Sequence, residues 1–357
     1  MRRPEVVFFS SLSFLMVTGS FLAATFSSSS HRAEAVSIPA PAATRATLLN
    51  QDFAHLCVPP SWRAAMPLAI RGPQNAQVPS RKIRWEIAES RIRKVLAKSR
   101  RTRFGLYMKN ISTGKTIEVN AGSRFASASL VKIPILISLY REMAAGKIAP
   151  TLGPLYLERH RIGGSGVLKG EHSGVKVNLR DLCYLMLQHS DNTATNILTD
   201  LVGMRRVTEI CREYGWKNTN MVRPVMALEL RSKGIENWTT PREMGMMLES
   251  IHRGQIVSPA ASKEMISLML NPPIDDRLPR YLPERIDIAH KTGLIYDVAH
   301  DVGLIYLPGD QTILVSAFAD RLGSNYRSAK IPMAQIARIL YEEATAPTAQ
   351  EKGRRSN

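Results

Sequence analysis

Cysteine and aromatic residues are scarce in this chain of 357 residues, which has three cysteines and 6% aromatic residues. Three cysteines are too few to build a small disulfide scaffold, and none falls in a Cys-x-x-Cys or Cys/His spacing of the kind that holds zinc. We therefore expect no zinc site held by cysteine. The composition, 44% apolar and 22% charged, also excludes a disordered chain, a collagen-like repeat and a polytopic membrane protein.

Acidic residues are in deficit, with 30 Asp and Glu against 48 Lys and Arg and a formal charge of +18. The densest basic run, 81–103, could attract polyanions such as the anionic polymers of a cell envelope. We favour the alternative, the solvated face of an amphipathic helix. No aromatic and basic nucleic-acid module accompanies the charge, so no nucleic-acid partner is predicted. The apolar stripe of this helix is formed by Trp85, Ala88, Ile92, Val95 and Leu96.

The first 35 residues have the pattern of an export signal. Arg2 and Arg3 precede an apolar stretch, 6–26, that serines and a glycine interrupt, and Ala33-Glu34-Ala35 offers a cleavage site. The pattern predicts a periplasmic or extracellular protein. The alternative is an uncleaved membrane anchor, because the stretch 6–26 approaches the length that spans a bilayer.

The rest of the chain divides into a linker, a domain and a tail. Residues 36–80 are rich in proline and alanine and predict a linker or an irregular extension. We expect one catalytic domain over 81–346, with a helical lobe over about 126–272. The tail, 347–357, is short and basic, and we expect it to be disordered.

The domain has the pattern of an α+β fold. Strands are predicted near 103–109 and 115–120 and again at 286–290, 302–307 and 312–319, with helices between them. Both chain ends should therefore contribute strands to one antiparallel sheet, into which a helical lobe is inserted. The flanking helices are predicted at about 82–99 and 329–344.

Two local patterns make narrower predictions. In Thr240-Pro241-Arg242-Glu243 we expect a helix start, with Thr240 as N-cap and Glu243 closing a capping box. Cys183 and Cys211 each fall in an apolar helical stripe, so we expect both to be buried as small hydrophobic residues.

The first motif with catalytic chemistry is Ser129-Leu130-Val131-Lys132. Residues three apart on a helix share a face, so the Lys132 amine can lie beside the Ser129 hydroxyl and activate it as a nucleophile. Pro134 indicates that a helix has just begun there, since proline is tolerated only near the first turn. A second match, Ser173 to Lys176, lies in a glycine-rich stretch with no apolar helix after it, and we interpret it as an accident.

The second motif is Ser190-Asp191-Asn192, at the predicted end of one helix and start of the next. A hydroxyl and a carboxamide held there can relay a proton and bind a substrate amide. The alternative interpretation is an Asp or Asn helix cap without catalytic function.

The third motif is Lys291-Thr292-Gly293. A glycine on a strand allows close approach by a ligand backbone, while a lysine and a threonine supply a cation and a hydroxyl for a carboxylate. The alternative is a solvated lysine on an edge strand.

With the three motifs in this order, the chain resembles the class A β-lactamases and the wider group of penicillin-recognising serine hydrolases. The resemblance covers about 81–346. It implies a β-lactamase/transpeptidase-like α+β fold, with a three-layer α/β/α lobe and an inserted all-helical lobe. It further implies a monomeric enzyme that opens β-lactam rings through an acyl-serine intermediate, without metal or cofactor.

The resemblance also implies roles for individual residues. Ser129 would be the nucleophile, Lys132 its base or proton relay, and Ser190 the group that passes a proton to the leaving nitrogen. Substrate binding would fall to Asn192 for the side-chain amide, to Lys291, Thr292 and Gly293 for the carboxylate and the strand-like edge, and to the N–H groups of Ser129 and Leu294 for the oxyanion.

One departure from the family pattern concerns the second half of the reaction. The Glu-x-x-Leu-Asn segment that supplies the deacylating base in typical class A enzymes is missing, and the corresponding positions near 224–226 are apolar. Glu229 is the nearest acid and Glu236 the next. We take Glu229 as the candidate base, against the alternative of an ordinary surface carboxylate, and expect that deacylation is slow.

Two other functions stay open at this point. One is a D,D-peptidase or esterase that acts on cell-wall peptides, and the other is a penicillin-binding or sensing module that stays acylated. Membrane contact is expected only if the segment 6–26 is retained. A Ser-His-Asp arrangement through His189, His290 or His300 is disfavoured because Gly-x-Ser-x-Gly is absent.

Overall fold

The structure, a computed structural model, describes residues 82–99 and 101–345. The predicted export signal at 1–35, the linker at 36–80 and the basic tail at 347–357 lie outside these residues. Within the described part of the chain, no helix is both long enough and apolar enough to cross a membrane.

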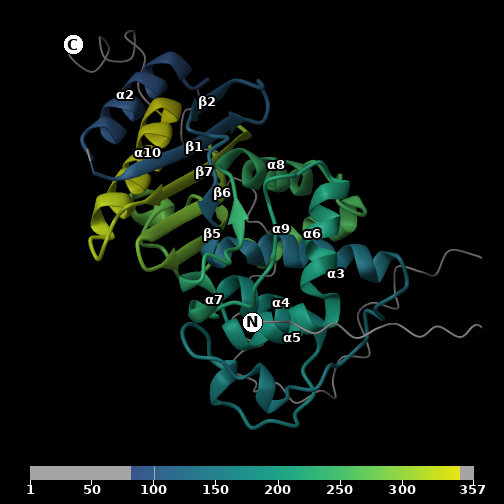
Figure 1. The fold of residues 1–357 in the computed structure, drawn as a ribbon. Helices are drawn as coiled ribbons and strands as arrows, with labels where there is room; N and C mark the ends of the chain where they lie inside the picture. Colours follow the sequence, from purple (N-terminus) through teal and green to yellow (C-terminus); the bar gives the residue numbers. More distant parts are fainter. Residues whose placement is uncertain (1–81, 100, 346–357) are drawn as a thin grey trace, which may run out of the picture. The chain divides into compact units, whose positions relative to one another are not determined.

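A five-stranded antiparallel sheet joins the two ends of the described chain, in the order β2-β1-β7-β6-β5 (Figure 1). The α+β prediction is confirmed, since β1 pairs along its whole length with β7. The bounds of one strand differ from the predicted run 286–290, because β5 begins at residue 288 and continues to residue 295, through the third motif, which the sequence also places on a strand. The strands are β1 (Arg103–Asn110), β2 (Thr116–Val119), β5 (Ile288–Ile295), β6 (Val298–Leu307) and β7 (Gln311–Asp320).

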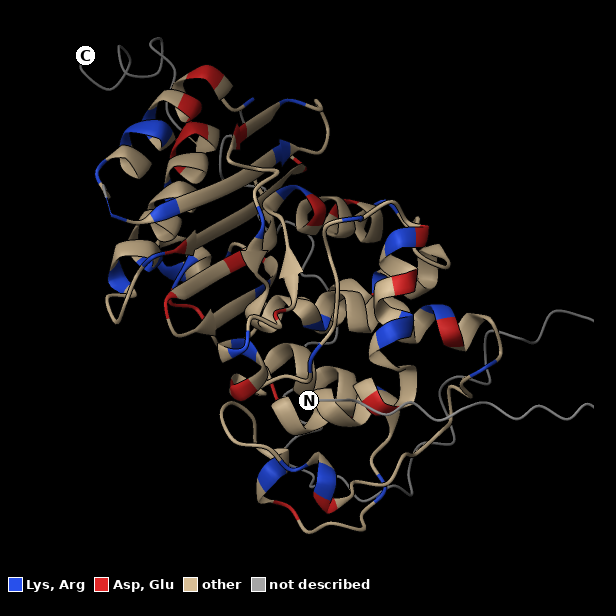
Figure 2. Ribbon diagram, viewed as in Figure 1, with Lys and Arg blue, Asp and Glu red and all other residues tan. Residues whose placement is uncertain are grey.

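Two helices, α2 (Trp85–Ala97) and α10 (Arg327–Thr345), cover one face of this sheet (Figure 1). The predicted amphipathic stripe is confirmed, with Trp85 and Ile92 buried in the core between helices and sheet. Several basic residues in and beside α2 form ion pairs with acids. Arg84 and Arg91 both bind the buried carboxylate of Glu343 on α10, at 2.7 and 2.8 Å. Figure 2 shows basic and acidic positions together on the helices at this end of the chain.

The opposite face of the sheet packs against the helical part of the chain and forms a second hydrophobic core. A two-stranded ribbon of β3 (Phe125–Ala126) and β4 (Trp238–Thr239) lies within this part. The helices are α3 (Lys132–Ala144), α4 (Leu179–Gln188), α5 (Asn192–Val202), α6 (Met204–Glu213), α7 (Leu228–Ser232), α8 (Pro241–His252) and α9 (Pro259–Met269), with short 3₁₀ turns η1 (Ala128–Val131), η2 (Glu158–His160), η3 (Leu168–Gly170) and η4 (Leu278–Tyr281).

The local predictions are confirmed in part. Thr240 caps α8, because its Oγ1 accepts the N–H of Glu243 at 3.1 Å. The capping box is wrong: the Glu243 carboxylate accepts hydrogen bonds from Asn218 and Thr219 instead of turning back to the cap. Cys183 and Cys211 are unpaired and buried, as predicted, and burial raises the pKa of the Cys211 thiol to about 12.

Gly105 on β1 is a point of close approach between the sheet and the helical part. A Cβ at this position would lie 2.7 Å from both Phe125 Cε2 and Pro241 Cγ, nearer than real Cβ atoms come to their neighbours. Phe125 begins the ribbon that leads into η1, and Pro241 begins α8. The absent side chain therefore sets the distance between the sheet and the segment that carries the first motif.

We expect Gly105→Ala to lower the free energy of unfolding by on the order of 1–3 kcal/mol, because an extra methyl group in a packed core forces its neighbours to shift. Denaturant unfolding would measure this. Gly122→Ala is the matched control, since a Cβ there meets nothing within 4 Å. Equal effects of the two substitutions would contradict the role given to Gly105.

Candidate active site

Ser129 lies in the 3₁₀ turn η1, directly before α3, and is half-buried. In a 3₁₀ turn the side chains of residues i and i+3 eclipse one another, which brings Lys132 next to Ser129. Pro134 is the third residue of α3, so the sequence-based prediction of a helix start here is confirmed. The other Ser-x-x-Lys match, Ser173, lies in an exposed irregular loop.

The amine of Lys132 joins the first two motifs. Lys132 is completely buried, and its Nζ donates to the backbone oxygen of Ser190 at 2.6 Å. It also lies 3.1 Å from Ser190 Oγ and 2.9 Å from Asn192 Oδ1. One nitrogen is thus held by three oxygen atoms from a segment about 60 residues away in sequence.

The environment of Lys132 disfavours its charged form. Burial, and then the nearby ammonium group of Lys291, hold the pKa of the Lys132 amine well below its usual value, against the pull of the Asp191 carboxylate. A neutral amine beside a serine hydroxyl can take up the proton of that hydroxyl. Lys132 is therefore the candidate base for Ser129.

Asp191 connects the second motif to the loop before α4. Its Oδ1 accepts the N–H of Ala194 at 2.9 Å and caps α5. Its Oδ2 accepts the N–H groups of Val167 and Leu168 at 2.7 and 2.8 Å. The cap interpretation of the motif is thus confirmed for Asp191, while the flanking Ser190 and Asn192 contact Lys132. Ser190 adopts a left-handed backbone with φ +51°, which turns it toward that amine.

Asn192 is held from two sides. Its side-chain oxygen faces Lys132, and its Nδ2 donates to the carbonyl of Gly163 at 3.1 Å. Its backbone N–H donates to Ser165 at 3.1 Å. The loop around residues 163–168 and the second motif therefore form one hydrogen-bonded unit beside Lys132.

The third motif lies on β5, which packs against η1. Gly293 faces the residues on either side of Ser129: a Cβ on it would lie 3.3 Å from both Ala128 and Leu130. Lys291 is on the same face, since alternate residues of a strand point the same way. Burial and the guanidinium of Arg277 lower the pKa of Lys291 to about 7, against the pull of Asp301.

Arg277 is a candidate that the sequence did not reveal. It is buried, its Nε has no partner, and its Nη1 donates to Asp276 at 2.9 Å. It is close enough to Lys291 to oppose the charge of that lysine. Within the sequence Arg277 follows two aspartates, a pattern that indicates only a local ion pair.

The histidines near the motifs are engaged elsewhere. His290 and Asp301 form a completely buried pair at 2.8 Å, and Asp301 also accepts the N–H of Leu278. His290 lies on the face of β5 opposite to Lys291, because it is one residue away. His300 lies 2.8 Å from the carbonyl of Ala126, and burial lowers its pKa to about 3.

Glu229, the candidate deacylating base, is exposed on α7, where its carboxylate binds Lys233 at 2.7 Å. Glu236 is buried in an ion pair with Arg223 at 2.6 Å. The side chain beside Asn192 is instead that of Met226. The Cβ position of Gly164 lies within 2.8 Å of Asn192 Nδ2 and 3.3 Å of Met226 Sδ, so these two side chains flank the same glycine.

Comparison with known proteins identifies β-lactamases among the proteins similar to this chain. The family model described as "Beta-lactamase enzyme family" matches residues 87–344. A β-lactamase of Streptomyces fradiae is 27% identical over 284 residues, covering 78% of this chain and 91% of that protein. The crystal structure of a β-lactamase from Sphaerobacter thermophilus is 30% identical with a TM-score of 0.67, covering 72% and 99%. A mutant of PBP-A, in an acyl-enzyme complex with penicillin G, is 25% identical with a TM-score of 0.66, covering 77% and 100%.

We expect Asp191→Asn to lower the free energy of unfolding by about 2 kcal/mol, because an amide nitrogen cannot accept the N–H groups that now reach the buried carboxylate. Thermal unfolding, with hydrogen exchange at Val167 and Leu168, would measure the loss. The control is Asp310→Asn on an exposed turn. If exchange at Leu168 stayed as slow as in the parent protein, Asp191 would not be what holds the loop.

Proposed function

Because the chain belongs to the beta-lactamase enzyme family, we propose that it is a serine β-lactamase of the class A type in which Ser129 forms the acyl-enzyme. The observation that carries this proposal is the buried amine of Lys132, shared between Ser190 and Asn192. An amine with a lowered pKa is a suitable base for a serine nucleophile at neutral pH.

Acylation then requires removal of the Ser129 proton, stabilisation of the oxyanion and protonation of the leaving nitrogen. Ser129 Oγ attacks the lactam carbonyl carbon while Lys132 takes the hydroxyl proton. The N–H groups of Ser129 and Leu294 stabilise the oxyanion, each by about 3 kcal/mol in sites of this kind. When the carbon–nitrogen bond breaks, Ser190 donates a proton to the leaving nitrogen and recovers one from Lys132, which lies 3.1 Å away.

The carboxylate of the substrate would bind at β5. Lys291 and Thr292 supply an ammonium group and a hydroxyl, and Arg277 adds a guanidinium whose Nε has no partner. A substrate carboxylate would offset the repulsion between Lys291 and Arg277, which lowers the pKa of Lys291 in the free protein. Asn192 would hold the side-chain amide, and the edge at Gly293 would lie along the substrate.

Deacylation is the slow step in this proposal. Hydrolysis of the acyl-serine ester requires a base that activates water, and Glu229 would have to leave Lys233 to serve as one. Met226, beside Asn192, cannot accept a proton. A penicillin-binding module that stays acylated is therefore the second candidate, and the likeness to the penicillin G acyl-enzyme of the PBP-A mutant favours it over a cell-wall peptidase or esterase.

Export is part of the proposed function. A protein that acts on β-lactams or on cell-wall peptides meets these substrates outside the cytoplasmic membrane. The signal-like pattern of residues 1–35 supports a periplasmic or extracellular location, and retention of residues 6–26 would anchor the protein there. The basic surface suits proximity to anionic envelope polymers.

We expect a chromogenic cephalosporin to give a burst of about one equivalent, followed by slow turnover, with a matching adduct in the intact mass. Ser129→Ala should remove both signals and lower kcat/KM by about 10³ or more. Glu229→Gln should leave the burst and the slow phase unchanged.

Other results of this experiment would support a different mechanism. Fast turnover lost in Glu229→Gln would make Glu229 the deacylating base. An adduct that never clears would identify the penicillin-binding module. An adduct that persists in Ser129→Ala would end the proposal for this nucleophile.

The pH dependence of kcat/KM should have an alkaline limb governed by Lys291. Its ammonium form binds the carboxylate, and with a pKa of about 7 it is lost as pH rises. Lys291→Arg keeps a cation at all working pH values, so the alkaline limb should move upward by at least about one pH unit. The exposed control Lys233→Arg should not move it, and an unchanged limb in Lys291→Arg would exclude Lys291 as its cause.

A further inference from the structure

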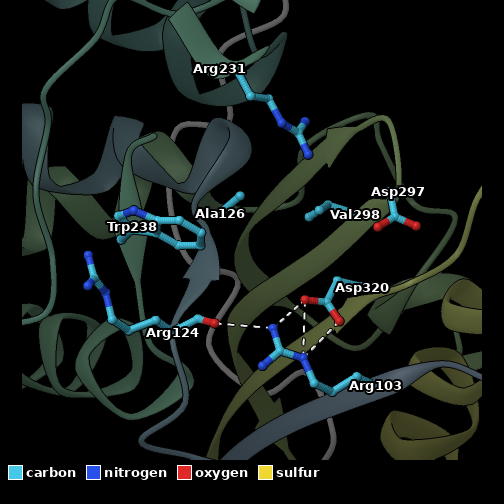
Figure 3. Close-up of a pocket in the computed structure, with 8 residues that line it drawn as sticks. All are labelled: Arg103, Arg124, Ala126, Arg231, Trp238, Asp297, Val298 and Asp320. Atoms are coloured by element: carbon cyan, nitrogen blue, oxygen red, sulfur yellow. Dashed lines mark hydrogen bonds and ion pairs between the residues drawn. The ribbon is translucent and has the colours of Figure 1, made fainter. Parts of the chain in front are cut away.

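A cavity of about 320 Å³ lies at the end of the sheet, outside the three motifs (Figure 3). Its floor is the last cross-strand row on the face that carries η1, formed by Val298, Asp320 and Arg103. The ribbon of β3 and β4 covers one side, with Ala126 and Trp238, and α7 closes the top with Arg231.

The cavity is separate from the site around Ser129. The next row of the same face contains Gly293 and His300, and the residues beside Ser129 pack against that glycine. The row after it contains Lys291. With about 3.3 Å per strand residue, the cavity floor is roughly 13 Å along the sheet from the Lys291 row. The turn η1, which carries Ser129, packs on the Gly293 row, one row from the cavity floor.

The upper wall of the cavity has an excess of positive charge. In Figure 3 the guanidinium of Arg231 points down between Trp238 and Val298. Arg231 and Arg223 share the single carboxylate of Glu236, at 3.2 and 2.6 Å, so together they keep one unneutralised charge. An anion bound below Arg231 would neutralise this remaining positive charge.

The remaining charged groups leave room for one anion. Arg103 is neutralised by Asp320 in a bidentate pair. Arg124 lies 5.1 Å above the Trp238 ring and adds a second positive charge at the rim. Asp297 opposes an anion, although one of its oxygens is occupied by the N–H of Gly323 at 2.8 Å.

The side walls are flat and apolar. Trp238 and Val298 line the space from opposite sides, and the small side chain of Ala126 lies between them in Figure 3. Aromatic faces bind rings, and a space of this size holds one small molecule. The walls are therefore complementary to a ring compound that carries one negatively charged group.

We propose that this cavity binds a small ring compound that carries a carboxylate, with the carboxylate on Arg231 and the ring on Trp238. The site is independent of the chemistry at Ser129 and leaves that nucleophile free. The ring can belong to an aromatic acid, which stacks on the indole, or to an acidic sugar, whose C–H groups can pack on it.

Calorimetric titration of the full chain with benzoate, with glucuronate and with inorganic phosphate tests this proposal. One equivalent of benzoate or glucuronate should bind with a Kd on the order of 1 mM or tighter, and whichever binds more tightly identifies the ring. Lys291→Gln should leave this binding intact, which separates it from the carboxylate subsite at β5 and from the fate of the proposed function.

Three variants locate the site. Arg231→Gln should weaken binding about tenfold or more. Asp297→Asn should strengthen it about threefold or more by removing the opposing charge, and asparagine suits the left-handed backbone of this position, φ +70°. Arg212→Gln, an equal loss of charge at an exposed site on α6, should have no effect.

The proposal is overturned if neither ring acid binds, or if phosphate binds as tightly as both, because the ring would then contribute nothing. It is also overturned if Arg212→Gln weakens binding as much as Arg231→Gln. Tighter binding by Asp297→Asn cannot result from unfolding. The proposal therefore stays testable even if Arg231→Gln fails to fold.

Discussion

The buried amine of Lys132 is the constraint on which the rest of this site depends. An ammonium group removed from water is costly, and the fold offsets only part of that cost with three oxygen atoms from Ser190 and Asn192. A second buried lysine, Lys291, adds repulsion. Burial and this repulsion therefore disfavour the charged form of Lys132, and the neutral amine is the form that can take a proton from a serine nucleophile.

Holding that amine in place needs backbone geometry that is itself unfavourable. Ser190 takes a left-handed conformation, and the segment is fixed because the buried Asp191 binds N–H groups on both α5 and the loop at 167–168. Gly293 allows η1 to lie directly on β5. The three motifs are therefore joined by contacts that no single motif contains.

The sequence predicts those parts of the fold that depend on local pattern. The strands at both chain ends, the start of α3 near Pro134, the cap at Thr240 and the buried stripe of α2 follow from periodicity and capping. The exact ends of β5 do not, because its pairing with β6, rather than its apolar run alone, sets them. The ion pairs of α2 with Glu343 and the turn of Glu243 toward Asn218 are equally invisible, since both depend on residues brought together by the fold.

The sequence likewise predicts some residues of the candidate site and misses others. The order of the motifs indicates Ser129, Lys132, Ser190 and Lys291, whereas Arg277 lacks any sequence signal because only the tertiary structure brings it near Lys291.

The most direct measurement of the central claim is an NMR titration of the lysine side-chain amines, with the Lys132 signal assigned by its absence in Lys132→Met. We predict that Lys132 titrates well below the usual value for lysine. Titration of Lys132 near the usual value for lysine, about 10.4, would contradict the account.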